Sequence, residues 1–287
     1  MTTLSSDEAV LARRMWSLFE PVHVVTYFTP EARSAFEAVG LRGFWRGYFG
    51  GRAAPLGPVG AAPVVAAFFG FARRMVERAV PDVWLRAAPE QALQARMDGA
   101  VAALAARFPA EPAGTLAEVA DLLEAAIDGL DCAGRVLGAA NAALPRPSDT
   151  WPRIWHATTV LREHRGDGHV AALVAAGVSG CETLVWRSSY DLVRDHLQPN
   201  RGWTDEEWDA ARASLVERGW LAADGSPTAE GEAHHAAVEA ATDRAALAPW
   251  RHLGPQGTQR LAELLTPIAR VLAVPLADFN PIGLPQP

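Results

Sequence analysis

Lysine is absent from this chain of 287 residues, and all 26 of its basic residues are arginine. A Schiff base to a carbonyl substrate, a covalently bound pyridoxal phosphate and a Walker-type phosphate loop each need a lysine, so these chemistries are excluded. The 33 acidic residues give a formal net charge of −7 and a pI of about 5.6. This balance disfavours nucleic acid as a partner, because phosphate contacts need basic side chains.

Cysteine and long apolar runs are also scarce. The two cysteines, Cys132 and Cys181, form no CxxC motif and no disulfide framework, which indicates a reducing compartment. The longest apolar stretch, residues 61–71, is too short to span a bilayer and is followed by Arg73 and Arg74. Residues 1–7 lack the basic region and apolar run of a signal peptide. We therefore expect a cytoplasmic protein with no membrane partner.

Residues 203–231 have the pattern of a helix, a short β-wing and a second helix. Thr204 can cap the first helix, and three acidic residues occupy its first turn. Residues 220–222 predict a short strand, and Asp224-Gly225 predicts a tight turn. Thr228 can cap the helix that follows. Together these signals predict a winged helix-turn-helix.

The charge of this helix is wrong for DNA. In a DNA-binding winged helix, residues 204–218 would lie in the major groove. This segment carries five acidic residues against two arginines, Arg212 and Arg218. Because phosphate contacts supply much of the affinity for DNA, such a surface would be repelled. The architecture is typical of a transcription factor, whereas the electrostatics argue against one.

The sequence can now be compared with known families. Its second half resembles a MarR-type winged helix, with Thr228-x-x-Gly231 where that family places its Thr-x-x-Gly motif. The whole chain is similar to the SCO-type helix-turn-helix family, an uncharacterised actinobacterial group. The segments that carry this resemblance are 20–23, 47–49, 51–57, 162–169, 202–208 and 280–285. The resemblance implies a fold and no particular activity, with a homodimer by analogy with MarR.

We therefore predict a mostly α protein, with a helical N-terminal domain packed on a MarR-like winged helix-turn-helix whose only sheet is a small β-wing. The proline-rich segment 144–150 is the best linker candidate. The predicted parts are a helical domain at 1–144, the winged helix-turn-helix domain at 151–273 and an extended C-terminal tail at 274–287.

Residues 162–169 form the densest cluster of chemically capable side chains: Glu163, His164, Arg165, Asp167 and His169. We expect them on a helix end and loop, because glycines flank Asp167. One interpretation is a His-carboxylate acid/base pair or an anion site. The other is a helix that stops at Gly166, with Asp167 capping the next helix. A metal site fits no standard zinc spacing, so none is predicted.

A second candidate group lies in the first 52 residues. His23 and Tyr27 precede an aromatic stretch that carries Arg46, Tyr48 and Arg52. One interpretation is an apolar pocket with a few convergent polar groups, walled by Phe28, Phe44, Trp45 and Phe49. The alternative is an aromatic core in which His23 is a hydrogen-bonded core residue.

Two tryptophans complete the candidate site. Trp155 follows the predicted linker, and Trp186 lies on the second helix of the predicted helix-turn-helix. Either ring could stack on a flat ligand, although Trp more often belongs to a core.

These observations favour a small-molecule-binding protein on a repurposed winged-helix scaffold, with an aromatic or amphipathic ligand between the two halves. Any cofactor-independent chemistry on that ligand would use His23, Tyr48 or His164, because histidine titrates near neutrality. No cofactor is predicted. The alternative is a ligand-responsive, MarR-like transcriptional regulator that presents Arg187, Arg194 and Arg201 to DNA. A third possibility is an interaction scaffold without an enclosed pocket.

Overall fold

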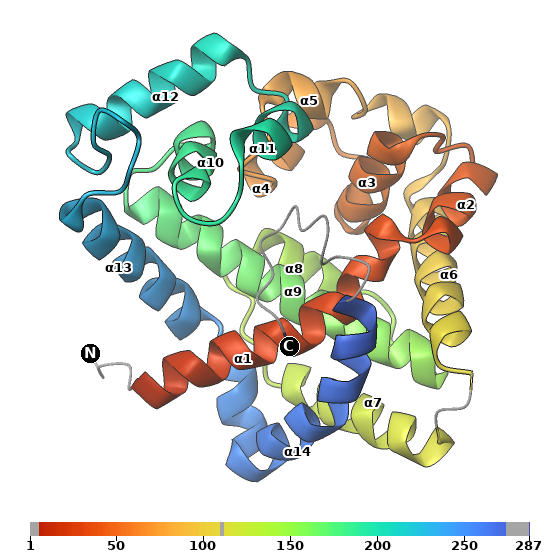
Figure 1. Cartoon of the computed structure of the whole chain (residues 1–287). Helices are drawn as coiled ribbons and strands as arrows, with labels where there is room; N and C mark the ends of the chain where they lie inside the picture. The colour runs from red at the N-terminus through yellow and green to blue at the C-terminus, as the bar shows by residue number, and fades with distance from the viewer. Residues whose placement is uncertain (1–5, 110–111, 274–286) are drawn as a thin grey trace.

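The computed structural model describes residues 6–109, 112–273 and 287, and the regular secondary structure in these ranges is helical (Figure 1). The helices before residue 144 are α1 (Ser6–Phe28), α2 (Pro30–Ala38), α3 (Phe44–Ala53), α4 (Ala61–Ala67), α5 (Arg73–Glu77), α6 (Pro89–Arg107), α7 (Ala113–Ile127) and α8 (Val136–Ala142), with 3-10 turns η1 (Ala54–Leu56) and η2 (Asp82–Leu85). Those after it are α9 (Thr150–Ala175), α10 (Gly180–Ser188), α11 (Arg194–Arg201), α12 (Asp205–Glu217), α13 (Ala229–Ala245) and α14 (Ala248–Ala273).

Helix α9 lies at the centre of the molecule (Figure 1). It packs against α1, α6, α7, α8 and α13. Every residue from Ile154 to Leu161 is buried, so this part of the helix has no solvent face. A helix that is buried around its whole circumference can direct side chains into several neighbouring elements at once.

The buried apolar residues form three large clusters. The largest combines α1, α6 and α7 with α9 and α14. A second lies among α2 to α6, and a third joins the end of α9 to the helices α10 to α13. The predicted domain boundary at 144–151 therefore falls between helices that share one core. The division into domains stays a prediction.

Helix α9 continues without a break through Gly166-Asp167-Gly168, so the predicted helix end and loop are wrong. A Cβ atom on Gly168 would lie 2.7 Å from Nη1 of Arg135 and 2.9 Å from Cβ of Ala245. The glycine is therefore needed for the close approach of neighbouring segments rather than to end the helix.

Helix α11 leads through a turn at Gly202 into α12, the helix that the sequence predicts would lie in the major groove in a DNA-binding winged helix (Figure 1). Gly202 adopts a left-handed conformation with φ of 77°, which favours glycine. The predicted cap of α12 is confirmed, since the Thr204 side chain accepts a hydrogen bond from the backbone N–H of Glu207. The predicted cap of α13 is also confirmed, with Thr228 accepting from the N–H of Gly231.

The predicted β-wing is wrong for the described residues, which contain no strand. The segment between α12 and α13 makes one isolated antiparallel bridge, between Leu221 and Pro227. Pro227 has no N–H to continue a ladder, and Thr228 already caps α13. The segment is therefore too short for paired strands, and we call it the α12–α13 turn.

Two further expectations concern the chain ends and membranes. The predicted extended tail lies outside the described residues, except for Pro287. Within residues 6–109 and 112–273, no single helix is long and apolar enough to cross a membrane. The pair α9 and α10 reaches that length and hydropathy only together, with a bend of 97° between them.

Candidate functional site

A buried polar network joins α3 to α9, and its centre is Glu163. This side chain is 1% exposed. Arg52 donates two hydrogen bonds to its carboxylate, from Nε to Oε1 at 2.9 Å and from Nη2 to Oε2 at 3.1 Å. Arg162 donates a third from Nη1 at 2.8 Å. Burial alone would raise the pKa of Glu163, but the charges of Arg162 and Arg52 hold it well below its ordinary value.

His23 forms a second part of this network, between α1 and α9. Its Nδ1 lies 3.0 Å from Oγ1 of Thr159, and its Nε2 lies 3.2 Å from the hydroxyl of Tyr27. The Thr159 hydroxyl donates its own proton to the carbonyl of Trp155. Thr159 must therefore accept from Nδ1–H, which leaves Nε2 to accept from Tyr27. Burial and the charge of Arg162 keep the pKa of His23 well below its ordinary value, so the ring is neutral.

Trp155 forms the wall behind His23. The two rings are stacked, with centroids 6.1 Å apart and planes 11° from parallel. The indole Nε1 donates to the backbone carbonyl of His23 at 3.2 Å. Trp155 therefore holds His23 in place and does not line the cavity described next.

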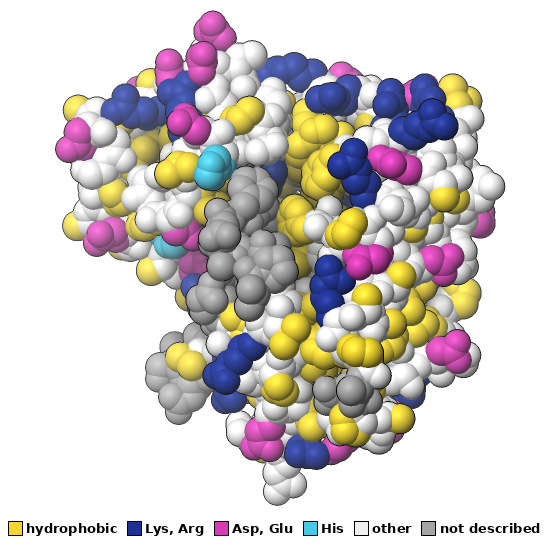
Figure 2. Space-filling view, turned by 45° about the vertical axis from the view of Figure 1, so that its right-hand side comes forward, with side chains coloured by type: hydrophobic (Ala, Val, Ile, Leu, Met, Phe, Trp, Pro, Cys, Tyr) yellow, Lys and Arg dark blue, Asp and Glu magenta, His cyan; other side chains and the backbone are white. Residues whose placement is uncertain are grey.

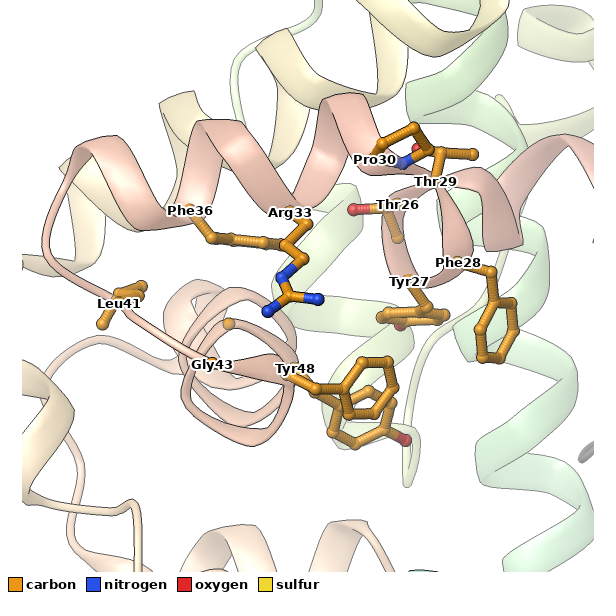
Figure 3. A pocket seen from close by; sticks show the side chains of 12 residues that line it. Thr26, Tyr27, Phe28, Thr29, Pro30, Arg33, Phe36, Leu41, Gly43 and Tyr48 are labelled. Atoms are coloured by element: carbon orange, nitrogen blue, oxygen red, sulfur yellow. The ribbon is translucent and has the colours of Figure 1, made fainter.

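A cavity of about 370 Å³ lies between the C-terminal end of α1, α2 and the start of α3 (Figure 3). Tyr27 and Tyr48 line the cavity, and their ring centroids are 5.0 Å apart. The hydroxyl of Tyr48 accepts a hydrogen bond from Nη1 of Arg52 at 3.2 Å. The two tyrosines therefore belong to the cavity wall and to the buried network. The other lining residues are Thr26, Phe28, Thr29, Pro30, Arg33, Phe36, Leu41, Gly43, Phe44 and Gly47.

The structure thus brings together six of the predicted site residues: His23, Tyr27, Tyr48, Arg52, Trp155 and Glu163. Two other candidates lie elsewhere. Arg46 points to Asp82, with Nε 3.8 Å from its carboxylate, and its side chain is 41% exposed. Trp186 packs against Trp220 at 4.7 Å, inside the core of α10 to α13.

The remaining residues of the 162–169 cluster point in different directions from α9. His164 is buried, its backbone lies against Gly138 of α8, and burial followed by the charge of Arg135 lowers its pKa to about 4. Asp167 accepts a hydrogen bond from the N–H of Gly138 at 2.8 Å, so it binds a neighbouring helix instead of capping the next one. Burial is the main reason that its pKa is raised.

Arg165 and His169 face α1 and α13. The guanidinium of Arg165 lies 4.1 Å from the ring centroid of Trp16. His169 shares a hydrogen bond of 2.9 Å with Oγ1 of Thr242, and burial lowers its pKa to about 4. These side chains therefore do not converge on one site with His164. Among the described residues, no group of three or more His, Cys, Asp or Glu side chains could hold a metal ion.

Sequence reasoning did not single out Arg96, a buried residue of α6. It donates to the carbonyl of Gly51 and to Oδ1 of Asn141, both at 3.1 Å, and lies 5.3 Å from the ring centroid of Trp155. Burial is the main cause that lowers its pKa to about 10. An arginine in the middle of an alanine-rich helix is the only signal in the sequence, and it does not reveal these partners.

Three of the five acidic residues of α12 pair with arginines of neighbouring helices. Arg194 of α11 donates to Asp205 at 2.7 Å and to Asp209 at 3.2 Å. Arg74 of α5 donates to Glu207 at 2.9 Å. Figure 2 likewise shows acidic side chains beside arginines across the upper part of the molecule.

The other two arginines predicted to face DNA also contact side chains of this protein. Arg187 donates to Asp191 at 3.0 Å. The guanidinium of Arg201 lies 4.8 Å from the ring centroid of Phe71.

The turn before α12 is hydrogen-bonded to the segment Gly70–Met75. Nε1 of Trp203 donates to the carbonyl of Gly70 at 3.0 Å, and the N–H of Ala72 donates to the carbonyl of Arg201 at 2.9 Å. A Cβ atom on Gly202 would lie 2.7 Å from Cβ of Met75. The start of α12, which the sequence predicts would contact base edges in a DNA-binding winged helix, is therefore covered on one side by this segment.

Comparison with known proteins adds one finding. The model of a helix-turn-helix family matches residues 12–275 of the chain. No curated protein and no solved structure matches the chain.

Proposed function

The chain belongs to this helix-turn-helix family, and on that premise we propose that it binds a small aromatic or amphipathic molecule in the cavity between α1, α2 and α3. The observation that carries the proposal is that Tyr27 and Tyr48 line the cavity while the buried network holds their hydroxyl groups. A volume of about 370 Å³ lies within the range of small-molecule sites. Such sites combine apolar walls with a few fixed polar groups.

In this proposal the predicted residues have different roles. Tyr27 and Tyr48 contact the ligand directly. His23, Arg52 and Glu163 lie behind them and act as positioning residues. The Tyr27 hydroxyl donates to His23, but burial raises the pKa of Tyr27 and lowers that of His23, so this pair supports binding rather than proton transfer. His164 is not among the residues that line this cavity and has no role in the proposal.

Family membership also favours a second candidate, the ligand-responsive transcriptional regulator. Two observations weigh against it. The arginines near α12 are held by carboxylates of this chain or lie against an aromatic ring, and the segment Gly70–Met75 covers one side of the start of α12. A regulator would need this segment to separate from the helix-turn-helix. A mobility-shift assay with genomic fragments at several salt concentrations tests it, since tight binding with a steep salt dependence would favour the regulator.

Calorimetry with one- and two-ring aromatic compounds tests ligand binding. Phe44→Ala removes an exposed wall ring, and we expect affinity to fall about two- to twelvefold, because an aromatic contact contributes about 0.5–1.5 kcal/mol. Leu85→Ala is the matched control, since Leu85 is also exposed and does not line the cavity. Native mass spectrometry of protein purified from its source organism would show a retained ligand. The proposal fails if no compound binds and none is retained.

The proposal also covers the relatives, the assembly and the location of the protein. We propose a MarR-like arrangement of the second half and a relationship to the actinobacterial SCO-type family. We also propose a homodimer formed through the terminal helices, as in MarR proteins, and a cytoplasmic location. Sedimentation equilibrium tests the dimer, and a purely monomeric protein at high concentration would contradict it.

A further inference from the structure

The cavity is apolar on most sides, and its polar groups lie together between α1, α2 and the start of α3. Among the described residues that line it, Arg33 is the one that is charged, and none is acidic. Figure 3 shows its guanidinium projecting from α2 toward α3. Its Nε donates to Oε1 of Glu37 at 3.1 Å. Its two terminal nitrogens make no hydrogen bond with the described residues, which leaves them available to a ligand.

Thr26 supplies the second polar group. The residue is 2% exposed, and its Oγ1 has no hydrogen-bond partner among the described residues. Figure 3 shows this hydroxyl directed into the space between α1 and α2. A buried hydroxyl without a partner is unfavourable, so a ligand that accepts its proton would gain from the contact.

The N-terminus of α3 supplies the third polar group of the cavity. Gly43 and Phe44, at its start, both line the cavity. The N-cap residue Gly43 has no side chain, so no side-chain hydrogen bond caps this helix of ten residues. The first backbone N–H groups of a helix have no intrahelical acceptor and carry partial positive charge. A cation, a hydroxyl donor and an uncapped helix start therefore meet at one apolar cavity.

We propose that the ligand is an aromatic carboxylate, whose ring packs among Tyr27, Phe28, Phe44 and Tyr48 and whose carboxylate is held by Arg33, Thr26 and the start of α3. This inference deepens the proposed function and rests on it. A planar carboxylate suits a guanidinium, which can donate two parallel hydrogen bonds. A neutral ring would leave Thr26 without a partner, and a cationic ligand would be repelled by Arg33.

The test compares acids with their isosteric amides. Calorimetry measures binding of 3-phenylpropionate, 3-phenylpropionamide, naphthalene-2-acetate and its amide to the full chain. We expect the acids to bind about tenfold more tightly than the amides. Arg33→Gln should abolish most of that difference. Arg73→Gln should retain it and is a closely matched control, because Arg73 forms the same exposed i,i+4 pair with Glu77.

Thr26→Val gives an independent readout that does not depend on Arg33. Removing the unpartnered hydroxyl should raise the melting temperature of the free protein while weakening acid binding about tenfold. A lower melting temperature with unchanged acid binding would overturn the role of Thr26. Equal affinities for acids and amides would overturn the carboxylate inference and leave the proposed function standing. If none of the four compounds binds, the carboxylate inference fails, and the wider set of aromatic compounds together with native mass spectrometry decides the proposed function.

Discussion

Replacement of Glu163 by glutamine tests the buried network most directly. Glu163→Gln keeps the shape of the side chain and removes the charge that Arg52 and Arg162 share. Arg162 keeps Glu20, whose Oε1 lies 3.5 Å from its Nε, whereas Arg52 has no other carboxylate partner among the described residues. The two guanidinium groups then remain buried beside a neutral amide. Breaking a buried ion pair from one side costs about 3–5 kcal/mol, because the remaining charge is left uncompensated. Since Glu163 is 1% exposed, solvent screens little of this interaction.

Urea unfolding followed by circular dichroism measures the change in unfolding free energy. Glu77→Gln is the matched control, because Glu77 pairs with Arg73 at 2.7 Å on the surface. Exposed i,i+4 pairs contribute about 0.3–0.5 kcal/mol, so the control should change little. A loss below about 1 kcal/mol for Glu163→Gln would refute the argument that this carboxylate stabilises the junction of α3 and α9.

The same pair of proteins gives a pH test. The folded state holds the pKa of Glu163 well below its ordinary 4.5. Its contribution to stability is therefore fully present above that value and is lost as the pH falls toward the folded-state pKa. The difference between wild type and Glu163→Gln should be constant near neutrality and should shrink on acidification. A difference that grows as the pH falls would contradict the sign of the shift.

Three further predictions concern α9 and α12. Burial lowers the pKa of His164 from 6.5 to about 4, so the free energy of unfolding should fall by up to about 3 kcal/mol as the pH drops between these values. Urea unfolding of His164→Gln should depend less on pH over the same range. Gly168→Ala should lower the free energy of unfolding by about 1–2 kcal/mol, because the new Cβ would meet Arg135. In the same thermal unfolding experiment Gly166→Ala should be neutral or stabilising, because the nearest atom to its new Cβ is 3.8 Å away. Thr204→Ala removes the cap of α12 and should cost about 1 kcal/mol, which denaturant titration can measure; an unchanged midpoint would contradict it.

Much of the local structure could be predicted because its causes lie within a few residues. The caps at Thr204 and Thr228 depend on hydrogen bonds to residues three positions later, and both were predicted correctly. The predicted strand after α12 failed for a local reason too. The pattern of a turn was recognised, but Pro227 and the immediate start of α13 leave no room for a ladder.

The candidate site could be predicted only in part. A histidine, two tyrosines and an arginine near aromatic residues indicated a pocket in the first 52 residues, and the structure places His23, Tyr27, Tyr48 and Arg52 together. Thr26 and Arg33 were missed, because threonine and a surface arginine carry no distinctive pattern. Their importance depends on which way they point from two different helices.

The sequence by itself determined the helical class, the helix caps and the unsuitable charge of α12, because each depends on residue type and short spacing. Only the tertiary structure decided that Glu163 meets Arg52 across 111 positions of sequence. It also decided that α9 runs unbroken through two glycines, since Gly168 packs closely against Arg135 and Ala245 from distant segments. Contacts of that range depend on how whole helices pack, and no local pattern encodes which residue lies opposite.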